Sequence, residues 1–138
     1  MTYLLDTNTV VAILRKKPAV VRERLRRAVS EDGLIFVSSV VLFELWYAVA
    51  HSQRRQENTE RLRVFVSGVS GVLAFDEGDA SIAGDLRATL EKGGTPIGPY
   101  DLLIAAQALR SCATLVTANV SEFARVTGLV WQDWTVDT

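Results

Sequence analysis

The chain has 138 residues, of which 49% are hydrophobic and 22% charged, so we expect one globular domain over residues 1–138 rather than a disordered or fibrous protein. No apolar run approaches the roughly 20 residues of a membrane span, and Asp6 interrupts the region where a signal peptide would be apolar. The lone Cys112 excludes an internal disulfide, and we interpret it as a packing residue in an apolar setting. These features predict a cytoplasmic protein without membrane association.

Short apolar runs alternate with helical patterns along the whole chain. The apolar runs predict strands at residues 3–5, 34–37, 72–75, 114–117 and 129–131, the last of them at an edge. Helical spacing predicts helices from residue 10 onward and at residues 18–29, 40–51, 59–67, 76–90, 101–109 and 121–126. The class is therefore α/β, and we expect a three-layer α/β/α sandwich with a central parallel sheet of four to five strands.

Three acids and an amide follow these elements at matching places. Asp6 ends the first strand, Glu44 lies about one turn into the helix after the second, Asp101 opens a helix, and Asn119 follows the fourth strand. In a parallel sheet these positions converge on one edge. Each acid also has a plainer interpretation, because Asp6 and Asp101 can cap helices and Glu44 can be a core acid with a polar partner.

Carboxylates gathered without a cation repel one another, and a divalent ion removes that conflict. Oxygen ligands without Cys or His suit Mg²⁺ or Mn²⁺ better than zinc. Such a site suits phosphodiester cleavage. The only histidine, His51, lies in a polar helix end, so the general base would be a carboxylate, Asp6 or Asp101, or a metal-bound hydroxide.

Four segments together carry a family resemblance: residues 3–8 (YLLDTN), 38–45 (SSVVLFEL), 97–106 (IGPYDLLIAA) and 116–123 (VTANVSEF). In this order the chain resembles the PIN domain, and more narrowly the VapC-type toxins of bacterial toxin–antitoxin pairs. The likeness covers essentially all 138 residues. It implies a PIN-like fold and a homodimeric, metal-dependent endoribonuclease that a cognate antitoxin protein neutralises. DNA would be contacted only indirectly, through the antitoxin.

The resemblance also carries roles onto individual residues. Asp6, Glu44 and Asp101 become the metal ligands, and with Asn119 the catalytic set. The family's fourth position is often Asp, so Asn119 is a departure that adds no charge. Thr7 and Thr117 would support the ligands from behind, although both can equally be ordinary caps.

Partner contacts can be predicted in part. A pocket of carboxylates would receive an Arg or Lys side chain of the antitoxin tail, displacing the metal. We expect the groove for that tail to be apolar and to involve Trp46, Tyr47, Leu62 and Phe65. Arg87 is a candidate for phosphate contact, as is the basic segment at residues 15–27, which can equally be a solvated helix face.

Two other functions compete with the nuclease. A phosphohydrolase that forms an aspartyl-phosphate on Asp6 would start similarly, but Asn8 stands where such enzymes usually have a second Asp. A catalytically silent PIN-like binding module is favoured only by the missing fourth acid at Asn119. Nucleotide binding of the P-loop or Rossmann type is disfavoured, because no Gly-rich loop follows any strand.

Overall fold

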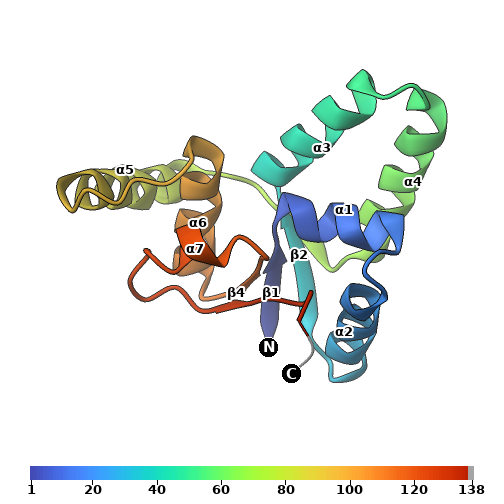
Figure 1. The fold of residues 1–138 in the computed structure, drawn as a ribbon, viewed down its shortest axis with the longest axis horizontal. Coiled ribbons are helices and arrows are strands. Elements are labelled where there is room, and N and C mark those ends of the chain that lie inside the picture. Colours follow the sequence, from blue (N-terminus) through green and yellow to red (C-terminus); the bar gives the residue numbers. More distant parts are fainter. Residues whose placement is uncertain (137–138) are drawn as a thin grey trace.

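A single parallel sheet organises the molecule, for which the computed structural model describes residues 1–136 (Figure 1). Its five strands lie in the order β3-β2-β1-β4-β5, and every neighbouring pair is parallel. The strands are β1 (Thr2–Leu5), β2 (Leu34–Ser38), β3 (Gly71–Leu73), β4 (Thr114–Val116) and β5 (Trp131–Gln132). The predicted α/β architecture is confirmed, with β5 at an edge as expected.

Helices cover the two faces of this sheet. They are α1 (Thr7–Arg15), α2 (Ala19–Ser30), α3 (Ser39–His51), α4 (Arg55–Gly68), α5 (Glu77–Lys92), α6 (Pro99–Ser111) and α7 (Val120–Phe123). Figure 1 shows α1 to α4 on one side and α5 to α7 on the other, with α5 and α6 paired in a hairpin that projects from the body. No helix in residues 1–136 is long and apolar enough to cross a membrane.

The strand register places the C-terminal end of the central strand, β1, in the middle of the carboxyl edge of the sheet. Leu5 of β1 lies opposite Val37 of β2 and Val116 of β4. The side chains of Leu4 and Leu5 are fully buried, as a strand covered on both faces requires. The next residue, Asp6, therefore leaves the sheet at its carboxyl edge between two neighbouring strands.

Local caps mark the ends of two helices next to the sheet. The Ser38 hydroxyl accepts from the amide of Val40 at the start of α3. Asp76 and Asp79 form a reciprocal capping box at the start of α5. Gly93 is the C-cap of α5.

Several boundaries differ from the prediction. Helix α4 begins at Arg55 rather than residue 59; its N-cap residue, Arg54, makes no side-chain cap that could be recognised in the sequence. Helix α6 begins at Pro99, two residues before Asp101, since proline fits the first helical position. Helix α7 ends at Phe123, three residues early. Strands β3 and β4 are shorter than predicted, and β5 starts two residues later.

The interpretation of Cys112 as a packing residue is wrong. Cys112 is exposed and follows the last residue of α6 in the left-handed conformation, with φ of 53°. Its backbone amide closes the helix on Leu109 O, 3.3 Å away. The chain reverses direction at this residue, so a side chain within an apolar stretch of sequence is turned out of the core.

Candidate acidic metal site

Asp6 is both a helix cap and a member of the predicted site. Its side chain is 5% exposed, and its Oδ1 accepts from the backbone amide of Thr9 at 2.8 Å, which caps α1. Burial raises the pKa of Asp6, whereas hydrogen bonds from Thr117 and Thr9 oppose the rise and the charge of Asp133 adds to it. The two interpretations of Asp6 are therefore compatible, because one carboxylate oxygen serves the cap.

Glu44 lies beside the start of α1. The Thr7 hydroxyl donates to Glu44 Oε1 over 2.8 Å, joining the first residue of α1 to the sixth of α3. Glu44 is half-buried, and Thr7 is its polar partner. The bond orients the Glu44 carboxylate at the same edge of the sheet as Asp6.

The pKa of Asp101 depends on the charges of the three other acids, Glu122, Asp6 and Glu44. It lies in the first turn of α6, and its pKa is raised to about 7. Burial is the largest cause, followed by the hydrogen bond and charge of Glu122 and then by the charges of Asp6 and Glu44. The pKa of Glu122 is lowered, chiefly because Asp101 donates a hydrogen bond to it. The charges of Asp6 and Glu44 thus both act on Asp101.

Asn119 connects two of the carboxylates. Its Nδ2 donates to Asp101 Oδ2 at 3.1 Å and to Glu122 Oε2 at 2.8 Å, while the amide of Gly98 donates to Glu122 Oε1 at 3.3 Å. A Cβ at Gly98 would lie 3.8 Å from the Asp101 oxygen and 3.9 Å from that of Glu122. Asn119 therefore presents its nitrogen to the acids and positions them.

Glu122 is the acid that sequence reasoning missed. It follows Asn119 by three residues, so α7 places both on one face of a single helical turn. That spacing was a signal available in the sequence. Glu122 supplies a fourth carboxylate beside Asp101, which Asn119 itself does not.

Thr117 lies behind Asp6 and Asn119. It is fully buried, its Oγ1 accepts from the amide of Asn119 at 2.9 Å, and its hydrogen bond to Asp6 stabilises that carboxylate. The two threonines predicted to support the site, Thr7 and Thr117, are thus each bonded to one predicted ligand.

The donor set fits a hard divalent cation in chemistry, although the side chains do not yet enclose one. All the donors are oxygens, and their mutual repulsion is what a cation would relieve. Within residues 1–136, no group of three or more His, Cys, Asp or Glu side chains is close enough to hold a metal ion as it stands. Asn119, bonded to both Asp101 and Glu122, occupies the space between two of the carboxylates. Ligation by three acids would therefore need side-chain rotation.

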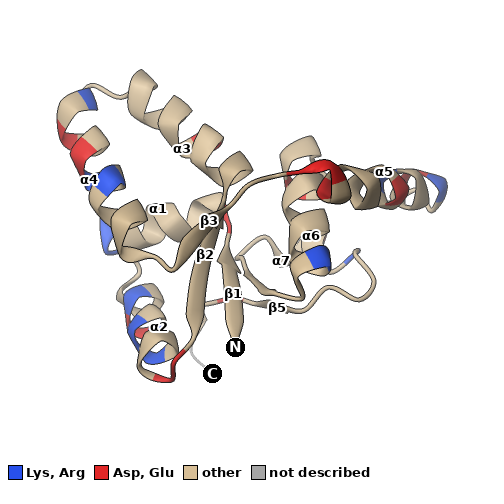
Figure 2. Ribbon diagram, turned by 180° about the vertical axis from the view of Figure 1, so that it is seen from behind, with Lys and Arg blue, Asp and Glu red and all other residues tan. Residues whose placement is uncertain are grey.

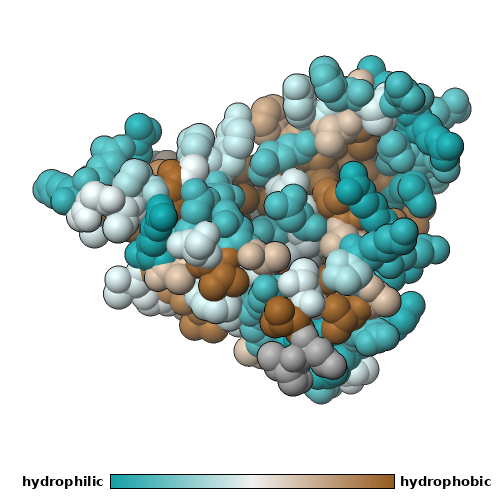
Figure 3. Space-filling model, in the orientation of Figure 1, coloured by the Kyte–Doolittle hydropathy of each residue, from teal (hydrophilic) through white to brown (hydrophobic). Residues whose placement is uncertain are grey.

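The residues predicted for partner contact do not form one surface. Leu62 lines a cavity of about 220 Å³ between α1, α3 and α4, where Figure 3 shows apolar side chains in a hollow. Phe65 lines a larger cavity of about 960 Å³ between α1, α2 and α4. Trp46 and Tyr47 are exposed on α3 and line neither, and Tyr47 stacks on His51 with centroids 5.3 Å apart.

The predicted phosphate contacts lie on two separate parts of the surface. Arg87 is an exposed residue of α5, pairs with Glu91 at 2.9 Å, and lines a cavity of about 520 Å³ with Tyr100. Figure 2 shows Lys and Arg along α2 and α4, on the opposite side of the sheet from the α5–α6 hairpin. The basic segment at residues 15–27 therefore belongs to the surface that holds the 960 Å³ cavity, which Lys16 and Arg22 line.

Fold and site together define a parallel α/β protein with an oxygen-donor centre at the carboxyl edge of its sheet. The PIN domain model matches residues 3–129, and the chain belongs to the PIN-domain family. It is 39% identical to the tRNA(fMet)-specific endonuclease VapC of Shigella flexneri and 37% identical to ribonuclease VapC2 of Rickettsia felis, in each case over 97% of this chain and 98% of the relative.

Solved structures agree with this assignment. The toxin–antitoxin complex VapBC2 of Rickettsia felis, bound to a DNA fragment from its promoter, contains a chain with a TM-score of 0.90 and 36% identity, covering 97% of this chain and 99% of that one. VapBC-1 of nontypeable Haemophilus influenzae gives a TM-score of 0.87 and 35% identity, over 99% of this chain and 100% of that one. The family resemblance seen in the four sequence segments is confirmed.

Proposed function

We propose that the protein is an endoribonuclease that depends on Mg²⁺ or Mn²⁺ and is the toxin of a toxin–antitoxin pair. The observation that carries the proposal is the hydrogen-bonded arrangement of the acids at one edge of the sheet, where Asn119 joins Asp101 to Glu122 and Thr7 holds Glu44; the raised pKa of Asp101, caused first by burial and then by the neighbouring acids, supports it. The names of the relatives supply the substrate class, RNA.

Asp6, Glu44, Asp101 and Glu122 would hold the ion. When bound, the ion supplies Lewis acidity and neutralises charge on the phosphodiester group. Of the two candidates for general base, Asp101 is better placed, because it is only half-buried, whereas Asp6 is 5% exposed and its Oδ1 is engaged by Thr9. Asp101 would accept the proton of the attacking oxygen.

The remaining polar residues orient these acids. Thr7 holds Glu44, Thr117 holds Asp6, and Asn119 holds Asp101 against Glu122. These bonds keep the carboxylates at one edge of the sheet, from where side-chain rotation would bring them onto an ion.

Partner recognition follows from the same charges. An Arg or Lys side chain of an antitoxin tail would enter the acidic site and compete with the ion. The tail would approach over α4, which carries Leu62 and Phe65 and borders both cavities, while exposed Trp46 and Tyr47 are available to an antitoxin or to the second subunit of a homodimer. Arg87 is retained as a candidate phosphate contact.

Cleavage of a structured RNA with Mn²⁺ by wild type and by Asp6→Ala tests the function. We expect a loss of at least about a hundredfold in rate for Asp6→Ala. The matched control is Asp85→Ala, an exposed acid on α5, which should cleave like wild type. Equal cleavage by wild type and Asp6→Ala would remove Asp6 from the mechanism.

Two observations weigh against the competing functions, a catalytically silent binding module and a phosphohydrolase. Glu122 provides the acid whose absence at Asn119 favoured a silent binding module. Phosphoryl transfer to Asp6 would require a free carboxylate oxygen facing solvent, but Asp6 is almost completely buried and capped by Thr9.

A further inference from the structure

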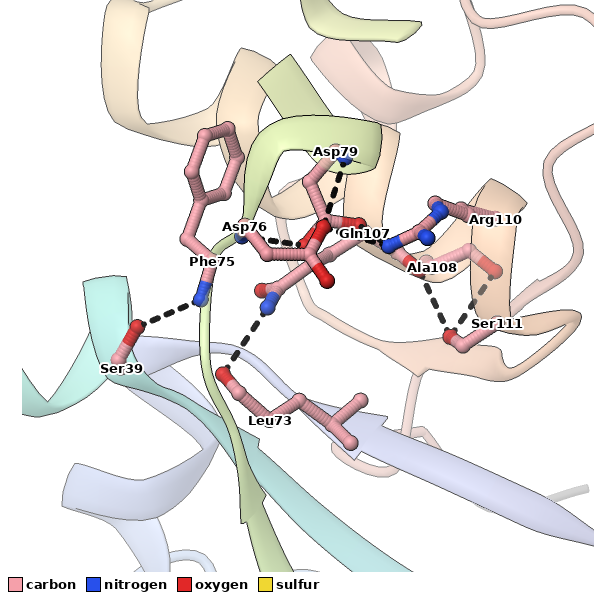
Figure 4. A network of polar contacts seen from close by, with 9 residues as sticks. All are labelled: Ser39, Leu73, Phe75, Asp76, Asp79, Gln107, Ala108, Arg110 and Ser111. Atoms are coloured by element: carbon pink, nitrogen blue, oxygen red, sulfur yellow. Dashed lines mark hydrogen bonds and ion pairs between the residues drawn. The ribbon is translucent and has the colours of Figure 1, made fainter. Parts of the chain in front are cut away.

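One short segment contacts two of the helices that supply acids to the site, α3 with Glu44 and α6 with Asp101. Residues 73–76, here called the 73–76 linker, run from the end of β3 to the cap of α5 (Figure 4). The amide of Phe75 donates to the hydroxyl of Ser39 on α3 at 3.0 Å. Gln107 Nε2 on α6 donates to the carbonyl of Leu73 at 2.9 Å. The linker is therefore hydrogen-bonded to α3 on one side and to α6 on the other.

The far end of the linker is fixed to α6 as well. Arg110 pairs with Asp76, the last linker residue, and with Asp79 at 3.4 Å (Figure 4). The guanidinium lies against Gly78, where a Cβ would overlap it. The start of α5 is thus bound to the end of α6, while the bond from Gln107 to Leu73 fixes the opposite end of the linker, next to β3, to the same helix.

Burying the side-chain amide of Gln107 is energetically unfavourable unless the amide makes a specific hydrogen bond. It is 2% exposed in an otherwise apolar part of α6, and its Oε1 has no hydrogen-bond partner within residues 1–136. Burying an amide with one half unsatisfied is unfavourable compared with an apolar side chain of the same size. The bond to Leu73 O, which also covers the outer edge of β3, is what the residue provides in return.

The two bonds to the linker lie one to two turns from the acids. Glu44 is five residues after Ser39 on α3, and Asp101 is six residues before Gln107 on α6. A helix is stiff over this length, about 9 Å for six residues, so a shift at one residue moves the other. The spacing of α3 and α6 at the linker therefore constrains the spacing of the two carboxylates, together with the direct contact of Phe43 and Tyr100, whose ring centroids lie 5.7 Å apart.

We infer that Ser39 and Gln107 are positioning residues for the metal site, acting through the 73–76 linker to fix Glu44 relative to Asp101. The inference rests on the proposed function, since it requires that these acids hold a metal ion. Neither residue needs to touch the ion or the RNA. Ion binding should be sensitive to both residues because ligand geometry has to be held within about 0.5 Å.

The Mn²⁺ affinity of the otherwise metal-free protein is the direct test, measured by the EPR signal of free Mn²⁺. Gln107→Met keeps the length of the side chain and removes the donor, and Ser39→Ala removes the acceptor. Each should weaken Mn²⁺ binding by about tenfold, the lower end of what loss of a supporting hydrogen bond costs. Ser39→Thr retains the hydroxyl and should bind like wild type.

The matched control is Ser111→Ala. The Ser111 hydroxyl bonds only to carbonyls of its own helix, Gln107 O at 2.7 Å and Ala108 O at 3.5 Å. Its removal takes a hydrogen bond from α6 without touching the linker, so Mn²⁺ affinity should change less than about twofold. The comparison separates positioning from a general weakening of α6.

The double variant Ser39→Ala/Gln107→Met gives the sharpest outcome. Because either bond alone connects one helix to the shared linker, losing both should weaken Mn²⁺ binding by about as much as losing one. Independent defects would multiply to about a hundredfold and would overturn the inference. So would unchanged affinity in a folded Gln107→Met or Ser39→Ala protein. If wild type itself does not bind Mn²⁺, the proposed function fails instead, and the inference with it.

Discussion

Replacing Asp101 by Asn is expected to stabilise the metal-free protein at neutral and alkaline pH. The pKa of Asp101 rises from its ordinary 3.8 to about 7, so between these pH values the folded protein holds a proton that the unfolded chain has released. The contribution of Asp101 to stability is therefore full below pH 3.8 and is lost as the pH rises through about 7. Asparagine is uncharged at every pH and can still donate to Glu122.

The size of the effect follows from the same pKa. A rise from 3.8 to about 7 corresponds to roughly 4 kcal/mol if nothing screens the charges. Asp101 is only half-buried, and screening by solvent reduces this to about 1–2 kcal/mol. Glu122 titrates in the opposite sense, because its pKa is lowered and its contribution is lost only as the pH falls below 4.5. The two effects are therefore separable above about pH 5.

Urea unfolding in EDTA at low salt, at about pH 5.5 and pH 8, measures this. Because pH 5.5 lies about midway between 3.8 and about 7, wild type should lose about half of the total, roughly 0.5–1 kcal/mol, between the two pH values, whereas Asp101→Asn should stay constant and exceed wild type at pH 8. Asp85→Asn, at an exposed position on α5, should follow wild type within about 0.5 kcal/mol. A wild-type stability that does not fall with pH, with Asp101→Asn no more stable at pH 8, would refute the electrostatic account of the site.

Three further changes probe the site and the core. Thr7→Val removes the donor to Glu44 and should cost about 1 kcal/mol in urea unfolding and about tenfold in Mn²⁺ affinity, both restored by Thr7→Ser. Glu122→Gln removes the nearest negative charge from Asp101, so the pKa of Asp101 in a carboxyl NMR titration should fall toward 3.8; an unchanged pKa would contradict the pairing. Phe123→Ala empties a fully buried position under α7 and should lower the free energy of unfolding by about 3–5 kcal/mol; a loss below 1 kcal/mol would show that the site collapses around the cavity.

The features set by local sequence were predictable. An apolar run ending in Asp6 identified the central strand, and alternation of strands with helices identified the parallel sheet. The apolar spacing predicted a helix over residues 76–90, and α5 runs from Glu77 to Lys92. These signals depend on residues close together in the sequence, so they can be recognised without knowledge of the fold.

Features set by tertiary packing were not predictable from the sequence. Glu122 was left without a role because its place beside Asp101 depends on α7 lying against the Gly98 turn, 24 residues away in the sequence. Cys112 turned outward because its backbone conformation, rather than its apolar neighbours, decides its direction. Trp46 and Tyr47 lie apart from the cavities of Leu62 and Phe65, because helical spacing alone does not specify which face a neighbouring helix covers.

The magnitudes explain how the fold can retain a repulsive acidic cluster before any cation binds. The cluster costs about 1–2 kcal/mol at neutral pH through Asp101 after screening. A single fully buried side chain such as Leu4 or Leu5, on the strand that delivers Asp6, contributes about 1.5–3 kcal/mol. The central strand therefore offsets the repulsion at its own end. The hydrogen bonds from Thr7, Thr117 and Asn119 then keep the acids from rotating apart, so the repulsion remains available as driving force for binding a cation.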